Sequence, residues 1–249
     1  YCVLFTHYVY FIYTLAIQQN SVIFMEDEID QIGFLFDLDG VIVDTAVLHY
    51  KAWRKLANSL GFDFTETQNE ELKGVGRMDS LDRILGWGGM TLSHNEKLEA
   101  AARKNAWYTE LTSTLTANDA LPGAIDFIER AQEKGIKIGL GSASKNALPV
   151  LKQLGITGLF DVIVDGHALT NNKPDPEVFL KGASGLDLLP SSIAVFEDAG
   201  VGIEAALSGG MTAIGIGPEG ALPDAAFVYT SLGEVDMELV ISLIQKNRS

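Results

Sequence analysis

Two aspartates, Asp37 and Asp39, directly follow a short apolar run at residues 32–36, which predicts a buried strand. Because one residue separates them, their side chains lie on the same side of an extended chain, and Gly40 then lets the backbone turn sharply. Two carboxylates this close call for a divalent cation, and carboxylate and carbonyl oxygens are ligands that suit Mg²⁺. A solvated acidic turn is the alternative interpretation. The polar segments further along the chain favour the metal site.

Three further polar segments follow predicted strands or the loops after them. They are residues 142–146, the segment 172–176 that contains Lys173, and the pair Glu197 and Asp198. In open α/β sheets, ligands bind outside the carboxyl ends of the strands, so these segments are expected to meet the first two aspartates at one edge of the sheet. Taken singly, they could be a helix cap, a surface lysine and an acidic turn. Their order and their common position after strands predict one site.

The residue types at this predicted site are those that phosphoryl transfer needs. The carboxylate of Asp37 can attack phosphorus and form an aspartyl-phosphate, which divides one difficult transfer into two easier ones. Asp39 can exchange a proton with a substrate hydroxyl, because crowding by other carboxylates raises the pKa of such a group. Ser142 can donate to a phosphate oxygen, and Lys173 can offset the charge that builds on the phosphoryl group. Mg²⁺ would reduce the repulsion between nucleophile and phosphate.

The rest of the chain supplies the elements that must position these groups. From Gly123 onward, short apolar runs alternate with helical patterns. Strands are predicted at 136–140, 162–164, 193–196 and 212–216, and helices near 123–134, 145–154, 176–185 and 200–208. Together with the strand at 32–36, this alternation predicts a doubly wound, parallel α/β sheet with helices on both faces.

Residues 46–118 have a different pattern, with helical apolar periodicity and no convincing strand. We therefore predict an all-helical cap domain inserted after the first strand, joined by two linkers that make a hinge. The predicted organisation is a hydrophobic N-terminal extension at 1–25, a core domain made of 26–45 and 119–249, and the cap at 46–118.

Composition and charge exclude several classes of partner. The net charge of −15 argues against nucleic acid and anionic membranes. The single cysteine, Cys2, fits a reducing compartment, so we expect a cytoplasmic protein. Residues 1–24 carry no charged side chain, but their apolar centre at 9–17 is too short to span a bilayer. We interpret this stretch as upstream sequence or an artefact; a hydrophobic anchor or a packing arm is the alternative.

The ordered motifs resemble those of a known family of enzymes. The set Asp37-x-Asp39, Ser142, Lys173-Pro174 and Glu197-Asp198 resembles the four motifs of the haloacid dehalogenase-type phosphotransferases, over roughly residues 30–240. The resemblance implies a Rossmann-like core, with Asp37 as nucleophile and Asp39 as acid and base. It also implies that Mg²⁺ is held by Asp37, the backbone carbonyl of Asp39, and Asp198, with Glu197 as a further acidic ligand.

The cap residues narrow the resemblance to the sugar-phosphate mutases of this family. The matching positions are His49, Trp53, Gly74, Arg77, Ser80, Lys104 and Asn105 in the cap, and Ala143, Ser144, Lys145 and Asn146 in the core. Singly, a histidine, tryptophan or arginine here would be a surface or core residue. Jointly, they imply that His49 holds a proton near Asp39 and that Arg77 grips a second phosphate bidentately.

The activity that this resemblance implies is the interconversion of β-D-glucose 1-phosphate and glucose 6-phosphate. It would be Mg²⁺-dependent and would proceed through an aspartyl-phosphate and glucose 1,6-bisphosphate, with a small sugar phosphate as the partner and a monomer as the working state. A sugar-phosphate phosphatase with the same catalytic residues is the alternative. A catalytically silent phosphosugar-binding protein is a third possibility, which the intact residues Asp37, Asp39, Lys173 and Asp198 argue against.

Overall fold

Six short strands form one parallel sheet in the computed structural model, which describes residues 32–248. They are β1 (Gly33–Phe36), β2 (Lys137–Gly141), β3 (Val162–Val164), β4 (Ile193–Glu197), β5 (Thr212–Ile216) and β6 (Phe227–Tyr229). The strand order is β3-β2-β1-β4-β5-β6, so β1 is central and Phe36 is in register with Leu140 and Phe196. Strands β1, β4 and β5 are buried along their whole length, because helices cover both faces of the sheet.

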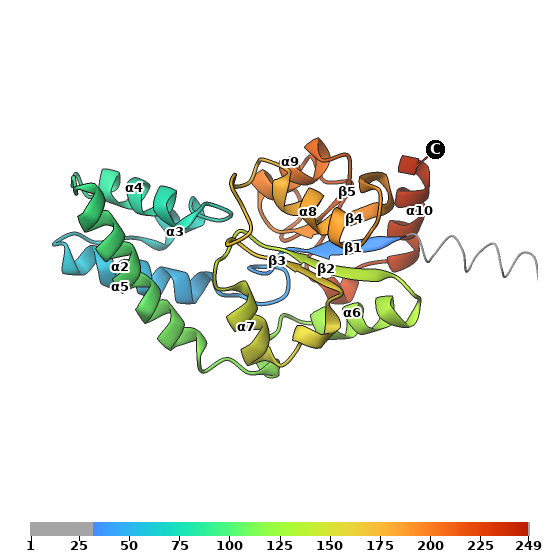
Figure 1. The fold of residues 1–249 in the computed structure, drawn as a ribbon, viewed down its shortest axis with the longest axis horizontal. Helices are drawn as coiled ribbons and strands as arrows, with labels where there is room; N and C mark the ends of the chain where they lie inside the picture. Colours follow the sequence, from blue (N-terminus) through green and yellow to red (C-terminus); the bar gives the residue numbers. More distant parts are fainter. Residues whose placement is uncertain (1–31, 249) are drawn as a thin grey trace, which may run out of the picture.

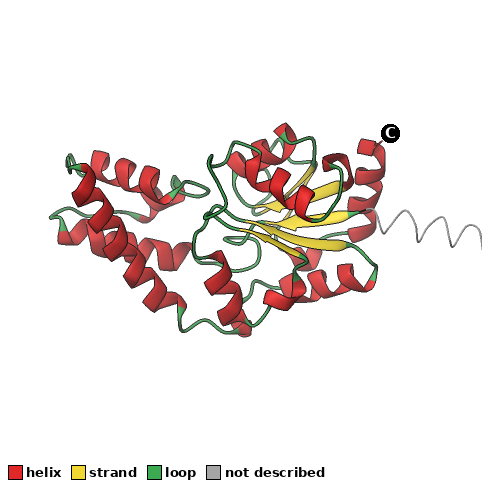
Figure 2. Cartoon of the chain, viewed as in Figure 1, coloured by secondary structure: helices red, strands yellow, loops and turns green. Residues whose placement is uncertain are grey.

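The helices of the core are divided between the two faces of the sheet (Figures 1 and 2). One face packs against α6 (Ala124–Glu133), α7 (Ala147–Leu154) and α10 (Met237–Arg248), and the other against α8 (Glu177–Gly185) and α9 (Gly200–Ser208). Short 3-10 turns lie at Ala117–Asp119, Thr157–Leu159, Pro190–Ser192 and Leu232–Glu234. Phe34, Phe36, Phe127 and Phe196 contact one another at the centre of the first face, which anchors the strand that carries Asp37.

A second, helical body lies beyond one end of the sheet, at the left of Figure 1. It consists of α2 (Ala46–Ser59), α3 (Glu66–Glu70), α4 (Arg77–Trp87) and α5 (His94–Thr112), all between β1 and β2. It has its own apolar cluster, which includes Trp53, Leu56, Phe64 and Ile84. Capping boxes at Thr65 and Ser93 fix where α3 and α5 begin.

The two connections between the bodies lie side by side. Val43 on the outgoing connection pairs with Ala120 on the return connection as an antiparallel bridge, and the Leu121 N–H donates to the Ile42 carbonyl at 2.8 Å. The helical body is therefore attached next to the carboxyl end of β1, where Asp37 lies.

The doubly wound α/β sheet predicted from the sequence is confirmed. The predicted strands agree with the observed ones, but β6 and α10 were missed. The helix predicted at 145–154 begins later, at Ala147, because Asn146 instead donates its backbone N–H to the Ser144 hydroxyl. Within residues 32–248, no helix is long and apolar enough to cross a membrane. The predicted N-terminal extension at 1–25 lies outside the described residues.

Candidate active site

A buried ion-paired corner forms where β1 and β4 end. Lys173 Nζ lies 2.6 Å from Asp37 Oδ1 and 2.8 Å from Glu197 Oε2, and only 1% of the lysine side chain is exposed. Burial alone would lower the pKa of Lys173, but the two carboxylates outweigh it and raise the pKa above its ordinary value. The loop after β3 thus brings a permanent cation to the predicted nucleophile.

Three carboxylates at this corner fit a divalent metal ion. Asp37, Glu197 and Asp198 each offer a carboxylate oxygen, and these oxygens lie within 4.8 Å of one another. Burial and mutual repulsion raise the pKa of Glu197 to about 7 and that of Asp198 to about 8. A bound cation would relieve this repulsion, and an all-oxygen ligand set is the kind that Mg²⁺ prefers. The fold thus brings together the side chains of three residues that the sequence analysis predicted as metal ligands.

The carboxyl group of Asp39 faces the linker to the helical body. Its Oδ1 accepts a short hydrogen bond from the Thr45 hydroxyl, while its backbone N–H donates to Asp37 Oδ2 at 3.0 Å. Burial, and next the nearby Asp37, raise the pKa of Asp39 to about 7, although the Thr45 hydroxyl opposes this shift. A carboxyl group with such a pKa can both take and give a proton near neutral pH, as an acid and base requires.

A second buried lysine, Lys104, lies inside the helical body. Its Nζ is 2.9 Å from His49 Nδ1 and sits over the rings of Trp53 and Tyr108, at 4.5 Å and 4.8 Å from their centroids. Burial and the nearby Arg77 lower the pKa of Lys104 to about 7. Burial, Lys104 and Arg77 also lower the pKa of His49 well below its ordinary value, so its imidazole is neutral at pH 7.

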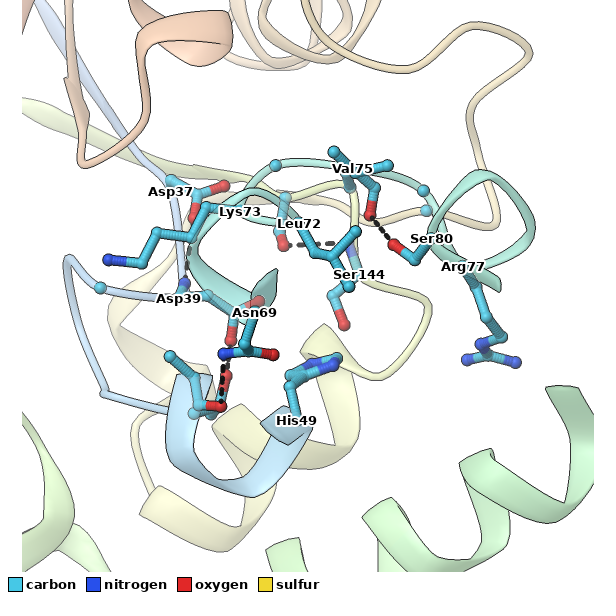
Figure 3. Close-up of a pocket in the computed structure, with 18 of the residues that line it drawn as sticks. Asp37, Asp39, His49, Asn69, Leu72, Lys73, Val75, Arg77, Ser80 and Ser144 are labelled. Carbon is cyan, nitrogen blue, oxygen red and sulfur yellow. Dashed lines mark hydrogen bonds between the residues drawn. The ribbon is translucent and has the colours of Figure 1, made fainter. Parts of the chain in front are cut away.

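A cavity of about 990 Å³ lies between the two bodies and joins these groups. All of the site residues predicted from the sequence line it except Asn105, which instead accepts a hydrogen bond from Asn146 Nδ2 at 2.9 Å. In Figure 3, Asp37 and Asp39 lie on one side of the cavity and Arg77 on the other, with His49 and Ser144 between them. The sequence therefore predicted a set of residues that the fold does bring together.

The far end of the cavity is suited to an anion. Arg77 is the first residue of α4, it is half-buried, and burial lowers its pKa from the ordinary value. Among the described residues it forms no ion pair with a carboxylate, so its guanidinium is available to a ligand. Lys145 also lines this cavity, in the turn before α7. A ligand that spans the cavity can thus meet cations at both ends.

Three residues of the site were missed at the sequence level. Lys73 Nζ lies 3.7 Å from Asp198 Oδ2, Thr45 donates to Asp39, and Tyr108 packs on His49 with ring centroids 4.1 Å apart. Tyr108 had a signal, because it stands four residues after Lys104 on the same helix. Lys73 and Thr45 had none, since their importance depends on how the cap meets the core.

The loop between α3 and α4 of the helical body approaches the core closely at a glycine. Gly74 has φ +71°, and a side chain there would come within 2.7 Å of Val201, just after the acidic pair. At Gly200, the residue before Val201, no atom lies near the place that a side chain would take. A glycine at position 74 is therefore required for the loop to reach the metal corner.

Comparison with known proteins places the chain in a family. Residues 33–210 match the haloacid dehalogenase-like hydrolases. A β-phosphoglucomutase of Bacillus subtilis is 41% identical over 208 residues, which cover 83% of this chain and 92% of that protein. A phosphorylated carbohydrates phosphatase of Thermotoga maritima is 34% identical over 183 residues, covering 72% and 82% respectively. The crystal structure of a β-phosphoglucomutase from Clostridium difficile aligns with a TM-score of 0.82 at 44% identity, covering 86% of this chain and 97% of that one.

The chain belongs to the haloacid dehalogenase-like hydrolase family, as its motifs predicted. It is an enzyme of the phosphotransferase type. Within that family, two of the proteins compared, one by sequence and one by structure, carry the name β-phosphoglucomutase.

Proposed function

We propose that the protein is a phosphomutase that interconverts β-D-glucose 1-phosphate and glucose 6-phosphate through glucose 1,6-bisphosphate. The observation that carries this proposal is the cavity with a cation at each end, Lys173 beside Asp37 and Arg77 on the other side, with Lys145 as a further cation in its lining. A bisphosphate that must present first one phosphate and then the other to Asp37 needs a cation at both ends. The mutase relatives at 41% and 44% identity support the same substrate class.

Asp37 is the proposed nucleophile. One of its carboxylate oxygens bonds to phosphorus while the bond from phosphorus to the donor oxygen breaks, which gives an aspartyl-phosphate and a free hydroxyl. Lys173 holds Asp37 Oδ1 at 2.6 Å and so fixes the orientation of the carboxylate. We assign the metal ligands to Asp37, Asp198, the backbone carbonyl of Asp39 and Glu197; Mg²⁺ bound there would neutralise charge on the phosphoryl group.

Asp39 is the proposed acid and base. It protonates the departing hydroxyl oxygen in one direction and removes the proton from the attacking hydroxyl in the other, and a pKa of about 7 suits both roles. His49 and Lys104 hold the sugar side of the cavity, with Trp53, Gly74, Ser80 and Asn105 as neighbouring substrate-binding positions. Ser142, with Ala143, Ser144 and Asn146, completes the core side.

A sugar-phosphate phosphatase is the second candidate, because a phosphatase from Thermotoga maritima is 34% identical to this chain. The two activities share the first half-reaction and differ in what discharges the aspartyl-phosphate. Arg77 favours the mutase, since it can hold the bisphosphate in place while the cap excludes water.

The deciding experiment incubates the protein with β-glucose 1-phosphate, Mg²⁺ and a trace of glucose 1,6-bisphosphate. Glucose 6-phosphate and inorganic phosphate are followed together. We expect fast formation of glucose 6-phosphate with negligible phosphate release, and no product from Asp37→Asn. Stoichiometric phosphate release would replace the mutase with the phosphatase.

The organisation of the chain belongs to the same proposal. We take 26–45 with 119–249 as the core domain, 46–118 as the cap and 1–25 as an extension outside both. The catalytic cavity is built from one chain, so we expect the enzyme to work as a monomer, and we expect it in the cytoplasm.

A further inference from the structure

The hydroxyl of Tyr108 is a buried polar group that the mechanism above does not use. Tyr108 is fully buried on α5, and its hydroxyl makes no hydrogen bond within the described residues. A hydroxyl taken from water without a partner destabilises a fold, and a phenylalanine would fill the same space without this penalty. The position therefore carries a polar atom that the described state does not need for stability.

The groups around this hydroxyl connect it with Asp39, the proposed acid and base. Tyr108 packs on His49 at 4.1 Å between ring centroids, and Lys104 Nζ lies 4.8 Å from its ring. The hydroxyl end lies beside the Thr45 hydroxyl, close enough for Thr45 to lower its pKa although the two groups do not meet hydrogen-bond geometry, and the charges that act on it are those of Asp39 and Arg77. Thr45 in turn donates to Asp39 Oδ1, so the three oxygens of Tyr108, Thr45 and Asp39 follow one another from the cap to the core.

The protonation states of Tyr108, Thr45 and Asp39 determine which group donates each hydrogen bond. Burial, and next the charge of Asp39, raise the pKa of Tyr108 above its ordinary value, so the phenol stays protonated and can donate. Thr45 uses its only proton on Asp39 and keeps lone pairs with which it can accept. A donor to Thr45 strengthens the bond that Thr45 makes to the carboxylate, because hydrogen bonds in a chain polarise one another.

We propose that Tyr108 is a positioning residue for the acid and base: as the cap closes, its hydroxyl donates to Thr45 Oγ1 and fixes the orientation of the Asp39 carboxyl group. This inference rests on the proposed function of Asp39. It requires only a small adjustment, since Thr45 is the linker residue that caps α2, and α2 already packs against α5, which carries Tyr108.

The test removes the hydroxyl alone. Tyr108→Phe should lower kcat roughly 10- to 100-fold, less than or at most equal to the roughly 10²- to 10⁴-fold that a general acid–base group itself contributes, while KM for β-glucose 1-phosphate stays within about twofold. Its thermal unfolding midpoint should equal or exceed that of the unchanged protein, because no hydrogen bond of the described state is lost. Tyr229→Phe, the same chemical change on β6 and outside the cavity, is the control and should leave kcat unchanged.

A double-mutant cycle separates positioning of Asp39 from every other role. If Tyr108 acts through Asp39, then Tyr108→Phe should cause no further loss in an Asp39→Asn background. An equal loss in both backgrounds, a change in KM alone, or an unchanged kcat would each overturn the proposal. A lowered unfolding midpoint with unchanged kinetics would also overturn it, because it would show a structural hydroxyl.

The measurement follows glucose 6-phosphate and inorganic phosphate in parallel. If the unchanged protein releases phosphate and forms no glucose 6-phosphate, the mutase assignment fails, but the effect of Tyr108→Phe is still read from the rate of phosphate release. Thr45→Val provides a second variant, which should reproduce the loss of kcat and make Tyr108→Phe silent on top of it.

Discussion

Two lysines of this protein are buried to nearly the same degree and yet have opposite pKa shifts. As whole residues, Lys173 is 6% exposed in the core and Lys104 is 2% exposed in the cap. Two carboxylates raise the pKa of Lys173, whereas burial beside Arg77 lowers the pKa of Lys104 to about 7. The lysine of the core corner is therefore fully paired with carboxylates before any ligand binds, and the repulsion that remains among Asp37, Glu197 and Asp198 suits the corner to a further cation. In the cap pocket, Lys104 and Arg77 form no ion pair with a carboxylate of the described residues, so the pocket is suited to an anionic ligand.

The largest expected loss of activity comes from replacing Asp37, the proposed nucleophile. Asp37→Asn keeps the size of the side chain but removes the nucleophile, so kcat should fall by roughly 10⁴-fold or more. Rapid-quench trapping of the phosphorylated protein checks this result, and no phosphoprotein should accumulate. Persistent glucose 6-phosphate formation by this variant would show that another residue accepts the phosphoryl group.

Removing Lys173 tests how much its two ion pairs stabilise the core corner. Lys173→Met leaves Asp37 and Glu197 buried together without their cation, so the free energy of unfolding should fall by ~3–5 kcal/mol. Chemical denaturation with and without Mg²⁺ is the measurement, and Mg²⁺ should restore part of the loss. Lys134→Met removes an exposed ion pair with Glu238 and should change stability by less than about 1 kcal/mol. Equal effects of the two variants would contradict the comparison.

Removing the cap lysine should have the opposite sign. Lys104→Met should raise the free energy of unfolding at pH 7 by ~1–3 kcal/mol, because a buried, partly charged group is replaced by an apolar one of similar length. It should also raise KM for the sugar phosphate.

The rise in the free energy of unfolding caused by Lys104→Met should depend on pH, because the pKa of Lys104 is lowered in the folded protein. Between about pH 7 and its ordinary value of 10.5, the unfolded chain binds the proton that the folded protein has released, so the unchanged protein gains stability as pH rises. The advantage of Lys104→Met should therefore shrink from pH 7 to pH 10. Urea midpoints across this range measure it; a constant advantage would mean that Lys104 stays protonated in the folded protein as it does in the unfolded chain, with no lowered pKa.

The smallest expected effect lies at the ion pair of Glu177 and Lys181 on α8, where the lysine side chain is exposed. Lys181 and the backbone N–H groups of Asn171 and Thr170 lower the pKa of Glu177 to about 2 from 4.5. This contribution to stability is present above pH 4.5 and is lost as pH falls toward 2. Lys181→Met should thus lower the unfolding midpoint slightly at pH 6, less so in high salt, and not at all near pH 2. Thermal unfolding at the two pH values tests this expectation.

The core part of the site could be predicted because strand ends converge in a parallel sheet. Asp37, Ser142 and Glu197 each follow a recognisable apolar strand, and the fold class determines that such positions meet. By contrast, Lys73 and Thr45 act through contacts between cap and core, which no local pattern encodes.

The two missed elements of the fold had different causes. Helix α10 does carry a helical signal, since Met237, Val240, Ile241 and Ile244 recur at helical spacing and are buried. Strand β6 carries none, because Phe227 to Tyr229 is a short, partly exposed edge strand.

The paired connections between cap and core set how the cap can move. Val43 and Ala120 join the two connections into a narrow ribbon, and Val43 also bridges to Asp39. Two connections joined in this way are the hinge about which we expect the cap to rotate. Asp39 bridges directly to Val43 at the hinge, whereas Arg77 lies at the start of α4, on the opposite side of the cavity from Asp39. The same rotation therefore carries the phosphate grip through a long arc while the proton-transfer group stays almost where it is.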